Sequence, residues 1–354
     1  MNNLTIKQEK LTVIGAGSWG TALALVLADN GHEVTLLSRN DSQKQEINTE
    51  HRNSKYLPDI SLPENIVATT SLEEALEGVE TVIVAVPTKA IREQLRAILK
   101  FQQKPLVFVH VSKGIEPDTL LRISEIFEQE VPKSILKEIV ALSGPSHAEE
   151  VSLRHPTIVT VSAKNMEIAE NVRDLFMNQN FRVYTNPDLI GVEIGGALKN
   201  IIALAAGVSD GLGFGDNAKA ALITRGLAEI SRLGTKMGAN PLTFSGLTGV
   251  GDLIVTCTSV HSRNWRAGHM LGQGQNLEDV LQNMGMIVEG VRTTKAAYQL
   301  AQKYHCQMPI AEMLYHVLFN GVDAKEAVER LMGRLKKNEM EELVDILSAQ
   351  MEQS

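Results

Sequence analysis

The sequence predicts an α/β protein: an N-terminal domain built on a doubly wound, mostly parallel sheet, followed by an all-α C-terminal domain. Apolar strand segments alternate with helical segments through the first half of the chain, and a glycine-rich turn joins the first strand to the first helix. Strand patterns stop near residue 190, and helical periodicity continues beyond it. A chain of 354 residues exceeds a comfortable single domain, so we expect two, at residues 1–190 and 191–354.

The pattern Gly15-x-Gly17-x-x-Gly20 joins the first apolar strand to a helix over residues 21–30, and a second strand follows over residues 33–37. In a dinucleotide-binding fold the first glycine makes the tight turn, and the second lets the backbone approach a pyrophosphate. The third lets the helix pack closely on its strand. The phosphates then meet the positive end of the helix. This strand-turn-helix-strand context predicts a Rossmann-type unit that binds a dinucleotide.

The second strand ends in Ser38-Arg39. A site selective for NAD usually has Asp or Glu at this place, which binds the ribose hydroxyls. A carboxylate would repel a 2′-phosphate, whereas a guanidinium can donate two hydrogen bonds to it. We therefore expect NADP(H) to be accepted, with NAD(H) as the other candidate cofactor. A solvated Arg39 on a loop is the competing interpretation.

Further elements follow from periodicity and from cap residues. Strands are expected at residues 81–87, 106–111, 138–142, 157–162 and 181–184, and helices at residues 71–76, 90–99 and 166–177. Residues 71–76 begin with a capping-box pattern. In the second domain, helices are expected at residues 191–208, 218–237, 290–303 and 324–332, the last with Asp323 as its N-cap.

Composition excludes several function classes. The formal net charge of −8 gives no basic face for nucleic acid, so local cations must bind any anionic substrate. The chain has two cysteines, Cys257 and Cys306, and nine histidines without metal-ligand spacing, so we expect no disulfide framework and no metal site. The N-terminus resembles no export signal, and no uninterrupted apolar run approaches the roughly 18 residues of a membrane span. We expect a cytoplasmic protein without stable membrane insertion.

Lys199 shares a predicted helical face with two glycines. Gly191, Gly195 and Lys199 are spaced at intervals of four. A glycine inside a helix costs roughly 0.5–1 kcal/mol relative to alanine, so the pair indicates a close approach to the backbone. A lysine desolvated in such a crevice has a lowered pKa and can exchange a proton with a substrate. Helix packing would explain the glycines equally well, and spacing does not decide between the two.

A second polar cluster surrounds Asp252. Gly249 and Gly251 loosen the backbone just before it, and residues 262–264 form a run of donors suited to an oxyanion. Among them, Arg263 could bind a phosphate through two parallel hydrogen bonds. The competing interpretation is an ordinary helix N-terminus capped by Asp252, beside a polar surface turn.

Two loops follow predicted strands of the first domain. Lys113 comes directly after one strand, and a glycine-proline turn at residues 142–148 follows another. Doubly wound sheets bind ligands at the carboxyl ends of their strands. A lysine after a strand is usually solvated, so only this position makes Lys113 a candidate.

Six segments in order resemble bacterial NAD(P)-dependent glycerol-3-phosphate dehydrogenase. They are residues 15–21, 111–115, 142–148, 195–200, 246–253 and 262–264. Their order and spacing extend over nearly the whole chain, and six motifs in this order are far more specific than any single motif. The resemblance implies reversible reduction of dihydroxyacetone phosphate to sn-glycerol 3-phosphate, a precursor of phospholipids, with NADPH or NADH as hydride donor. It also implies a homodimer.

The resemblance implies roles for single residues. Lys199 corresponds to the general acid/base, Asn200 to its neighbour and Asp252 to the carboxylate that orients the lysine. The implied cofactor contacts are Gly15, Gly17, Ser18, Trp19, Gly20, Arg39, Lys113, Ala148, Arg263, Ile287 and Glu289. The implied substrate contacts are Lys113, Gly144, Ser146, Lys199, Asp252, Thr256, Ser262, Arg263 and Asn264. The tail from about residue 338 contains no recognisable motif, and we assign it no role.

Three other functions remain as alternatives. A related dehydrogenase acting on a β-hydroxy acid or a ketopantoate-like substrate would need cations placed for a carboxylate rather than a phosphate. A regulator that senses NADPH without turnover would need no proton donor such as Lys199. A purely structural protein would leave the glycine-rich strand ends unexplained.

Overall fold

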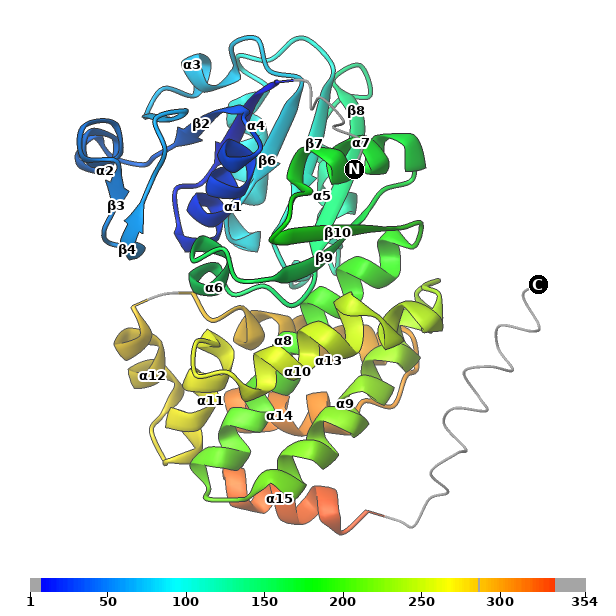
Figure 1. Ribbon diagram of the computed structural model, residues 1–354. Coiled ribbons are helices and arrows are strands. Elements are labelled where there is room, and N and C mark those ends of the chain that lie inside the picture. Colours follow the sequence, from blue (N-terminus) through cyan, green and yellow to red (C-terminus); the bar gives the residue numbers. More distant parts are fainter. Residues whose placement is uncertain (1–7, 286, 335–354) are drawn as a thin grey trace. The chain divides into compact units, whose positions relative to one another are not determined.

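The computed structural model describes residues 8–285 and 287–334 (Figure 1). Internal contacts divide them into two units: residues 8–112 with 123–189, and residues 113–122 with 190–334. The short segment 113–122 therefore groups with the second unit, although the sequence pattern placed it in the first domain. The tail from about residue 338 lies outside the described residues.

The first unit contains an eight-stranded sheet in the order β10-β9-β8-β7-β6-β1-β2-β5. Its strands are β1 (Lys10–Ile14), β2 (Glu33–Leu37), β5 (Ile66–Thr69), β6 (Thr81–Val84), β7 (Leu106–His110), β8 (Leu136–Ser143), β9 (Thr157–Ser162) and β10 (Phe181–Asn186). Neighbouring strands are parallel except β8 and β9, which are antiparallel. The strand order changes direction at the neighbouring parallel strands β1 and β6, the place where doubly wound sheets bind ligands. This topology confirms the predicted fold class.

Three strands were not expected. They are β5 at the sheet edge and the two-stranded antiparallel sheet of β3 (Arg52–Asn53) and β4 (Leu57–Ser61). β3 has two residues, β4 contains a proline, and the apolar run of β5 is limited to Ile66, Val67 and Ala68, so the sequence pattern of each strand is weak.

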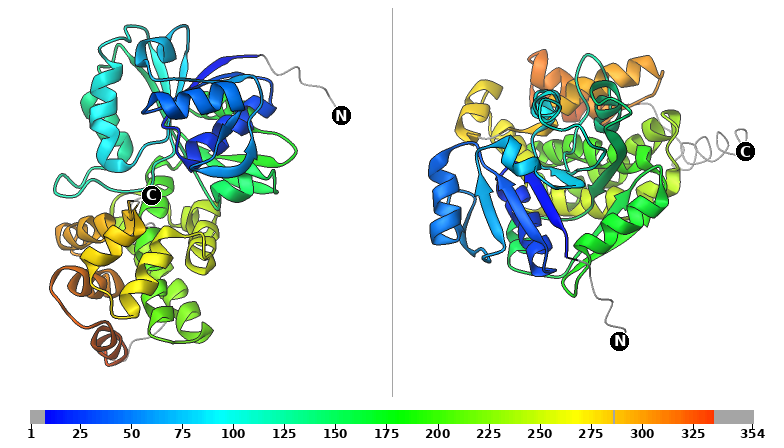
Figure 2. Two further views of the ribbon diagram at one scale, coloured as in Figure 1. Left: turned by 90° about the vertical axis from the view of Figure 1, so that its left-hand side faces the viewer. Right: turned by 90° about the horizontal axis from the view of Figure 1, so that it is seen from above.

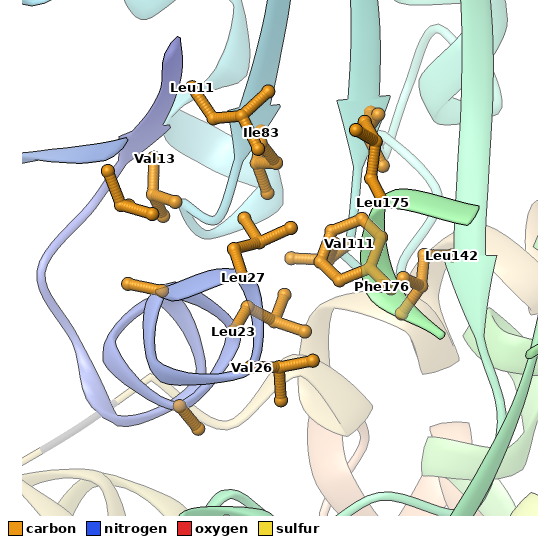
Figure 3. Close-up of a cluster of buried hydrophobic side chains, with 14 of the residues drawn as sticks. Leu11, Val13, Leu23, Val26, Leu27, Ile83, Val111, Leu142, Leu175 and Phe176 are labelled. Atoms are coloured by element: carbon orange, nitrogen blue, oxygen red, sulfur yellow. The ribbon is translucent and has the colours of Figure 1, made fainter. Parts of the chain in front are cut away.

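Helices cover both faces of this sheet (Figures 1 and 2). The helical segments of the first unit are α1 (Ser18–Asp29), α2 (Asp41–Gln45), the π turn η1 (Glu46–Glu50), α3 (Leu72–Leu76), the 3-10 turn η2 (Thr88–Ala90), α4 (Ile91–Ile98), α5 (Ile123–Glu130), α6 (Ala148–Ser152) and α7 (Met166–Phe176). On one face, Leu23 and Leu27 of α1 lie among strand side chains such as Val13 and beside Phe176 of α7 (Figure 3). On the other face, α5 contributes the core side chain Phe127, which packs on β7.

The capping box expected before α3 forms only in part. Ser71 accepts a hydrogen bond from the Glu74 N–H, as a cap residue should. The Glu74 carboxylate, however, accepts from the Thr69 hydroxyl instead of from the Ser71 N–H. The Ser71 N–H donates to the hydroxyl oxygen of Thr69 instead of to the Glu74 carboxylate. The helix start was therefore predicted correctly, and the reciprocal bond was not.

The described part of the second unit is helical from residue 190 onward, whereas its segment 113–122 forms no helix and contains an isolated bridge between Ile115 and Arg122. Its segments are α8 (Leu189–Gly211), α9 (Asp216–Lys236), the 3-10 turn η3 (Pro241–Ser245), the π turn η4 (Leu247–Gly251), α10 (Asp252–Thr258), α11 (Arg263–Gly272), α12 (Leu277–Met284), α13 (Glu289–Lys303), α14 (Pro309–Phe319) and α15 (Ala324–Met332). Asp323 caps α15 as expected, accepting from the Lys325 and Glu326 N–H groups.

Helix α8 is the buried core of the second unit. An 18-residue window of this 23-residue helix has a mean hydropathy of 1.6, which would suit a membrane span, but 89% of that window is buried in the protein. Glu193 and Lys199 interrupt its apolar sequence. Four glycines allow α11 to approach it closely: a Cβ added to any of Gly207, Gly211, Gly268 and Gly272 would lie 2.0–2.3 Å from a carbonyl oxygen of the other helix. The C-terminal half of α8 is thereby held closely against α11.

Candidate active site

A buried carboxylate shared by two lysines forms the centre of the site. Asp252 Oδ2 accepts a hydrogen bond from Lys113 Nζ at 2.7 Å, and Oδ1 accepts one from Lys199 Nζ. Lys199 Nζ also donates to Thr256 Oγ1 at 2.7 Å. Asp252 and Lys199 are both buried, with 1% and 7% of their surface exposed. Asp252 therefore does not cap α10, whose N-cap is Gly251 without a side-chain hydrogen bond.

Close backbone packing places Asp252 beside α8. A Cβ on Gly195 would lie 2.4 Å from the carbonyl oxygen of Thr248, in the turn η4 that leads into Asp252. A Cβ on Gly249 would lie 1.9 Å from the carbonyl oxygen of Phe244. Both positions therefore require glycine. Of the two explanations left open for Gly195, helix packing is correct, and that packing itself builds the site.

Burial and charge together set the protonation of the two central groups. Burial lowers the pKa of the Lys199 ammonium, Asp252 opposes this effect and Lys113 adds to it, and together they bring that pKa to about 8. Burial alone would raise the pKa of the Asp252 carboxyl, but Lys113 and Lys199 keep it below its usual value. Asp252 is thus an anion near neutral pH, while Lys199 can give or take a proton there.

Two asparagine side chains connect this cluster to neighbouring helices. Asn200 Nδ2 donates to the main-chain oxygen of Lys113 at 3.3 Å, and its Oδ1 accepts from Asn264 Nδ2 at 2.9 Å. Asn264 Oδ1 accepts from the Gly290 N–H at 2.8 Å. The structure therefore joins six predicted site residues in one network: Lys113, Lys199, Asn200, Asp252, Thr256 and Asn264.

The remaining predicted residues of the second unit lie at the starts of α11 and α13. Ser262 caps α11 by accepting from the Trp265 N–H, so the expected polar turn is in part an ordinary cap. Arg263 is exposed, and its Nη1 lies 3.5 Å from the main-chain oxygen of Ile287. Glu289 is the first residue of α13. None of these residues bonds directly to Asp252 in the described structure.

The glycine loop of the first unit fits a dinucleotide phosphate. Gly15 has a φ of +111°, and a Cβ there would lie 2.6 Å from the carbonyl oxygen of Ala85. A Cβ on Gly20 would lie 2.0 Å from the Gly15 oxygen, whereas a Cβ on Gly17 would meet nothing within 4 Å. The first turn of α1 has no acidic residue and no side-chain cap. Its N–H groups and the open side of Gly17 therefore suit an anion.

Sequence reasoning missed the residues that support this loop. Gln43 Nε2 and Asn53 Nδ2 both donate to the main-chain oxygen of Ala16, at 2.7 and 3.1 Å. Asn53 also donates to the Thr21 hydroxyl at 2.8 Å. The Ser18 hydroxyl donates to the Tyr56 oxygen at 3.3 Å. Ser18 belongs to the predicted glycine motif, whereas Gln43 and Asn53 belong to no recognisable motif, so only the folded chain reveals these two.

Arg39 is exposed after β2, and no hydrogen bond or ion pair from residues 8–285 or 287–334 engages its guanidinium. Its neighbour Ser38 is buried, with its hydroxyl 2.7 Å from Gln43 Oε1. Trp19 is half-buried against the core of the first unit. An accessible guanidinium is what binding of a 2′-phosphate requires.

The predicted substrate loop follows β8. Gly144 has a φ of +138°, and a Cβ there would lie 3.0 Å from the Val159 Cα, so a larger residue would be strained. The Ser146 hydroxyl donates to the Gly144 oxygen at 3.0 Å. Ala148 is buried at the start of α6. The loop is thus shaped mainly by its own backbone.

The described side chains include no cluster of metal ligands, and the thiol beside the charged cluster is protonated near neutral pH. Among the described side chains, no three of the His, Cys, Asp and Glu types lie together as metal ligands would. Cys257 is buried beside the cluster, and burial raises the pKa of its thiol to about 12. It is therefore a neutral, unreactive group near neutral pH.

Comparison with known proteins matches both halves of the chain. The NAD-dependent glycerol-3-phosphate dehydrogenase N-terminus family matches residues 10–169, and the corresponding C-terminus family matches residues 188–329. A glycerol-3-phosphate dehydrogenase [NAD(P)+] of Bacillus velezensis is 68% identical over 337 residues, which cover 95% of this chain and 98% of that protein.

Among solved structures, one is similar to this chain in both sequence and fold, and another is similar in fold alone. The crystal structure of a Coxiella burnetii glycerol-3-phosphate dehydrogenase is 38% identical, with a TM-score of 0.87, and the match covers 92% of this chain and 99% of the other. A ketopantoate reductase of Ralstonia eutropha is 13% identical with a TM-score of 0.56, covering 90% and 99% of the two chains. That second likeness shows the fold alone, so it does not support the ketopantoate-like alternative.

Replacing the central carboxylate tests the electrostatics of the cluster. In Asp252→Asn the attraction that raises the pKa of Lys199 is lost while burial and Lys113 remain, so that pKa should fall further below 8. Competitive acetylation of the amines over a pH series, followed by mass spectrometry of the Lys199 peptide, measures it. Asp323→Asn, an exposed cap on α15, is the control and should leave it unchanged. A rise toward the ordinary lysine value would contradict the dominance of burial.

Proposed function

This chain belongs to the NAD-dependent glycerol-3-phosphate dehydrogenase family, and we propose that it catalyses the reversible reduction of dihydroxyacetone phosphate to sn-glycerol 3-phosphate with NADPH or NADH. The resemblance inferred from six sequence segments is thus confirmed at the level of the family. The observation that supports this chemistry best is the buried Lys199 amine, titrating near 8 beside Asp252. Ketone reduction needs a proton donor of this kind, whereas a nucleotide sensor does not.

The protein's glycine loop would bind the cofactor, which when bound supplies the hydride. In this proposal Gly15, Gly17 and Gly20 let the backbone and the α1 N-terminus meet the phosphates. The other cofactor contacts we propose are Ser18, Trp19, Arg39, Lys113, Ala148, Arg263, Ile287 and Glu289.

Lys199 would act on the substrate oxygen. As the ketone carbon is reduced, negative charge grows on its oxygen, and a protonated amine both stabilises that charge and neutralises it. An ammonium has three hydrogens to donate. Two of those on Lys199 go to Asp252 Oδ1 and Thr256 Oγ1, which leaves the third for the substrate. Asp252 thereby orients the amine.

The substrate phosphate needs a cation of its own, since the chain has a net charge of −8. We assign this role to Arg263, whose guanidinium is exposed at the start of α11. The Ser262 hydroxyl accepts from its own helix and can still donate to an anion. Anchoring the phosphate away from the reacting carbon would orient the carbonyl and so lower the entropic barrier. Lys113, Asn264, Gly144 and Ser146 complete the proposed substrate contacts.

In the cell, we propose that the product supplies glycerophospholipid synthesis in the cytoplasm, and that the protein is a homodimer. The cytoplasmic assignment is supported by the two buried, unpaired cysteines. Sedimentation equilibrium of the purified protein tests the homodimer: a mass near twice 38.7 kDa is expected, and a mass of 38.7 kDa would contradict it.

Removing the proposed proton donor should abolish most of the activity. Lys199→Ala is expected to lower kcat for dihydroxyacetone phosphate reduction by about 10²- to 10⁴-fold, because general acid catalysis contributes that much. NADPH absorbance at 340 nm measures the rate. Lys164→Ala, which removes a surface lysine paired with Glu128, is the control and should retain wild-type turnover. A wild-type protein without turnover would refute the proposed function, and an unimpaired Lys199→Ala would refute the role of this residue.

The two reaction directions should depend on pH in opposite ways. Reduction needs the protonated amine, so its rate should fall as pH rises through about 8, the pKa of Lys199. Oxidation of sn-glycerol 3-phosphate needs the neutral amine, so its rate should rise through the same pH. Initial rates in both directions between pH 6 and 10 measure this, and two profiles with the same slope would contradict a single acid/base group.

Arg39 should determine how well NADPH is used relative to NADH. Arg39→Ala is expected to lower kcat/KM for NADPH by about 10- to 100-fold and to leave that for NADH nearly unchanged, because a charge-assisted pair is lost only with the 2′-phosphate. Arg39→Lys, which keeps the charge without the paired donors, should be intermediate. Arg173→Ala on α7 is the control. An unchanged ratio in Arg39→Ala would remove Arg39 from the cofactor site.

A further inference from the structure

A chain of amide groups connects the N-terminus of α13 to the main chain of Lys113. The Gly290 N–H donates to Asn264, Asn264 donates to Asn200, and Asn200 donates to the Lys113 carbonyl oxygen, at 2.8, 2.9 and 3.3 Å. We propose that Asn264 and Gly290 are positioning residues that, through Asn200, hold Lys113 against Asp252. This goes beyond the substrate contact implied for Asn264, and it rests on the proposed function only where turnover is the readout.

The chemistry of the two ends determines the direction of the chain. A backbone N–H can only donate, and a backbone carbonyl can only accept. The atom of Asn264 that faces Gly290 must therefore be its oxygen, so its nitrogen faces Asn200. The facing atom of Asn200 is then its oxygen, and its nitrogen faces Lys113. Reversing either amide would bring two acceptors or two donors together, so each orientation depends on both neighbours.

The packing around Gly290 leaves no room for a side chain. A Cβ there would lie 2.7 Å from the Asn200 carbonyl oxygen and 2.8 Å from Asn264 Oδ1. Gly290, Asn264 and Asn200 are all buried, so water is not a ready substitute for a lost partner. The glycine thus brings α13 close enough for its N–H to orient the first amide.

Lys113 depends on such support because it precedes a short segment without a regular helix. Further contacts along this segment attach it to the rest of the second unit: Ile115 is buried in the core, Asp118 pairs with Lys295 at 2.9 Å and bonds Gln299, and Arg122 pairs with Glu193. Each of them acts at least two residues from Lys113. The bond from Asn200 acts on the main chain of Lys113 itself, and so fixes where its side chain begins.

The position of Lys113 controls the charge that Lys199 experiences. Lys199 is faced by Asp252 on α10 and by Lys113, and Cys257 nearby stays a neutral thiol. Lys113 occupies Asp252 Oδ2 and repels the Lys199 ammonium, and both effects lower the pKa of Lys199. If Lys113 moved away, the negative charge of Asp252 would act on Lys199 alone. The pKa of Lys199 would then rise.

Two neutral variants break the chain at different points. Asn264→Leu removes both bonds of one amide with little change of shape, and Gly290→Ala displaces the Asn264 oxygen. Thr294→Val is the matched control: it removes a buried hydrogen bond to the Gly290 carbonyl oxygen within α13, outside the chain of amides. Competitive acetylation of the full-length protein without substrate gives the pKa of Lys199, and thermal unfolding of each variant shows that it is folded.

Both chain variants should raise the pKa of Lys199 by about one unit, since a nearby charge has been moved away. The midpoint of the pH profile for sn-glycerol 3-phosphate oxidation should rise equally, with an approximately 10-fold loss of rate below that midpoint. Thr294→Val should move neither. An unmoved pKa in the two folded variants would overturn the inference, and a raised KM with an unmoved midpoint would instead assign Asn264 to the substrate.

The two readouts separate this inference from the proposed function. Acetylation needs no turnover, so a shifted pKa in a protein that does not reduce dihydroxyacetone phosphate would support the chain of amides and refute the function. Turnover by the wild-type protein, together with an unchanged pKa of Lys199 in both variants, would support the function and refute the chain of amides. If one variant fails to fold, the other still tests the chain, because their substitutions lie on different helices.

Discussion

The site depends on one carboxylate, Asp252, which is shared between two ammonium groups. Removed from water, this anion is stable only because Lys113 and Lys199 bond its two oxygens. The same arrangement prevents Lys199 from being an ordinary lysine: burial lowers its pKa to about 8, and Asp252 keeps that pKa from falling further. A buried pair alone would be a structural ion pair. The third charge, Lys113, makes the proton affinity of Lys199 sensitive to its surroundings.

Glycine is the second constraint, and it acts through backbone packing. Gly195 admits the turn η4 that leads into Asp252, and Gly249 lets that turn close on Phe244. In the first unit, Gly15 and Gly20 press the loop onto the start of α1, while Gly17 remains open. A side chain at the tight positions would separate elements that must touch. Glycine therefore has different roles in the two units. In the second unit it lets charged groups come together, and in the first unit Gly17 leaves room for a ligand.

Much of this could be predicted from local patterns. Buried strands of a parallel sheet are continuous apolar runs, which can be recognised in the sequence. Asp323 and Gly20 act on residues within a few positions of themselves, so their roles can also be recognised there. The edge strand β5 has a run of only three apolar residues, β3 and β4 have none, and all three strands were missed. Gln43 and Asn53 were missed because they act on Ala16, which is distant in sequence. The role of Gly195 could not be settled, because a ligand and a packed turn demand the same absence of a side chain.

The sequence by itself determined the fold class, the family and the identity of the charged residues, because strand hydrophobicity, glycine spacing and six ordered segments are properties of local sequence. Tertiary structure alone decided what those residues do to one another. It showed that Asp252 bonds two lysines instead of capping α10, and that Lys113 belongs with the second unit. It also showed that Asn264 acts on Asn200. The physical reason is that burial and the distance between charges determine a proton affinity, and both exist only when distant segments pack together.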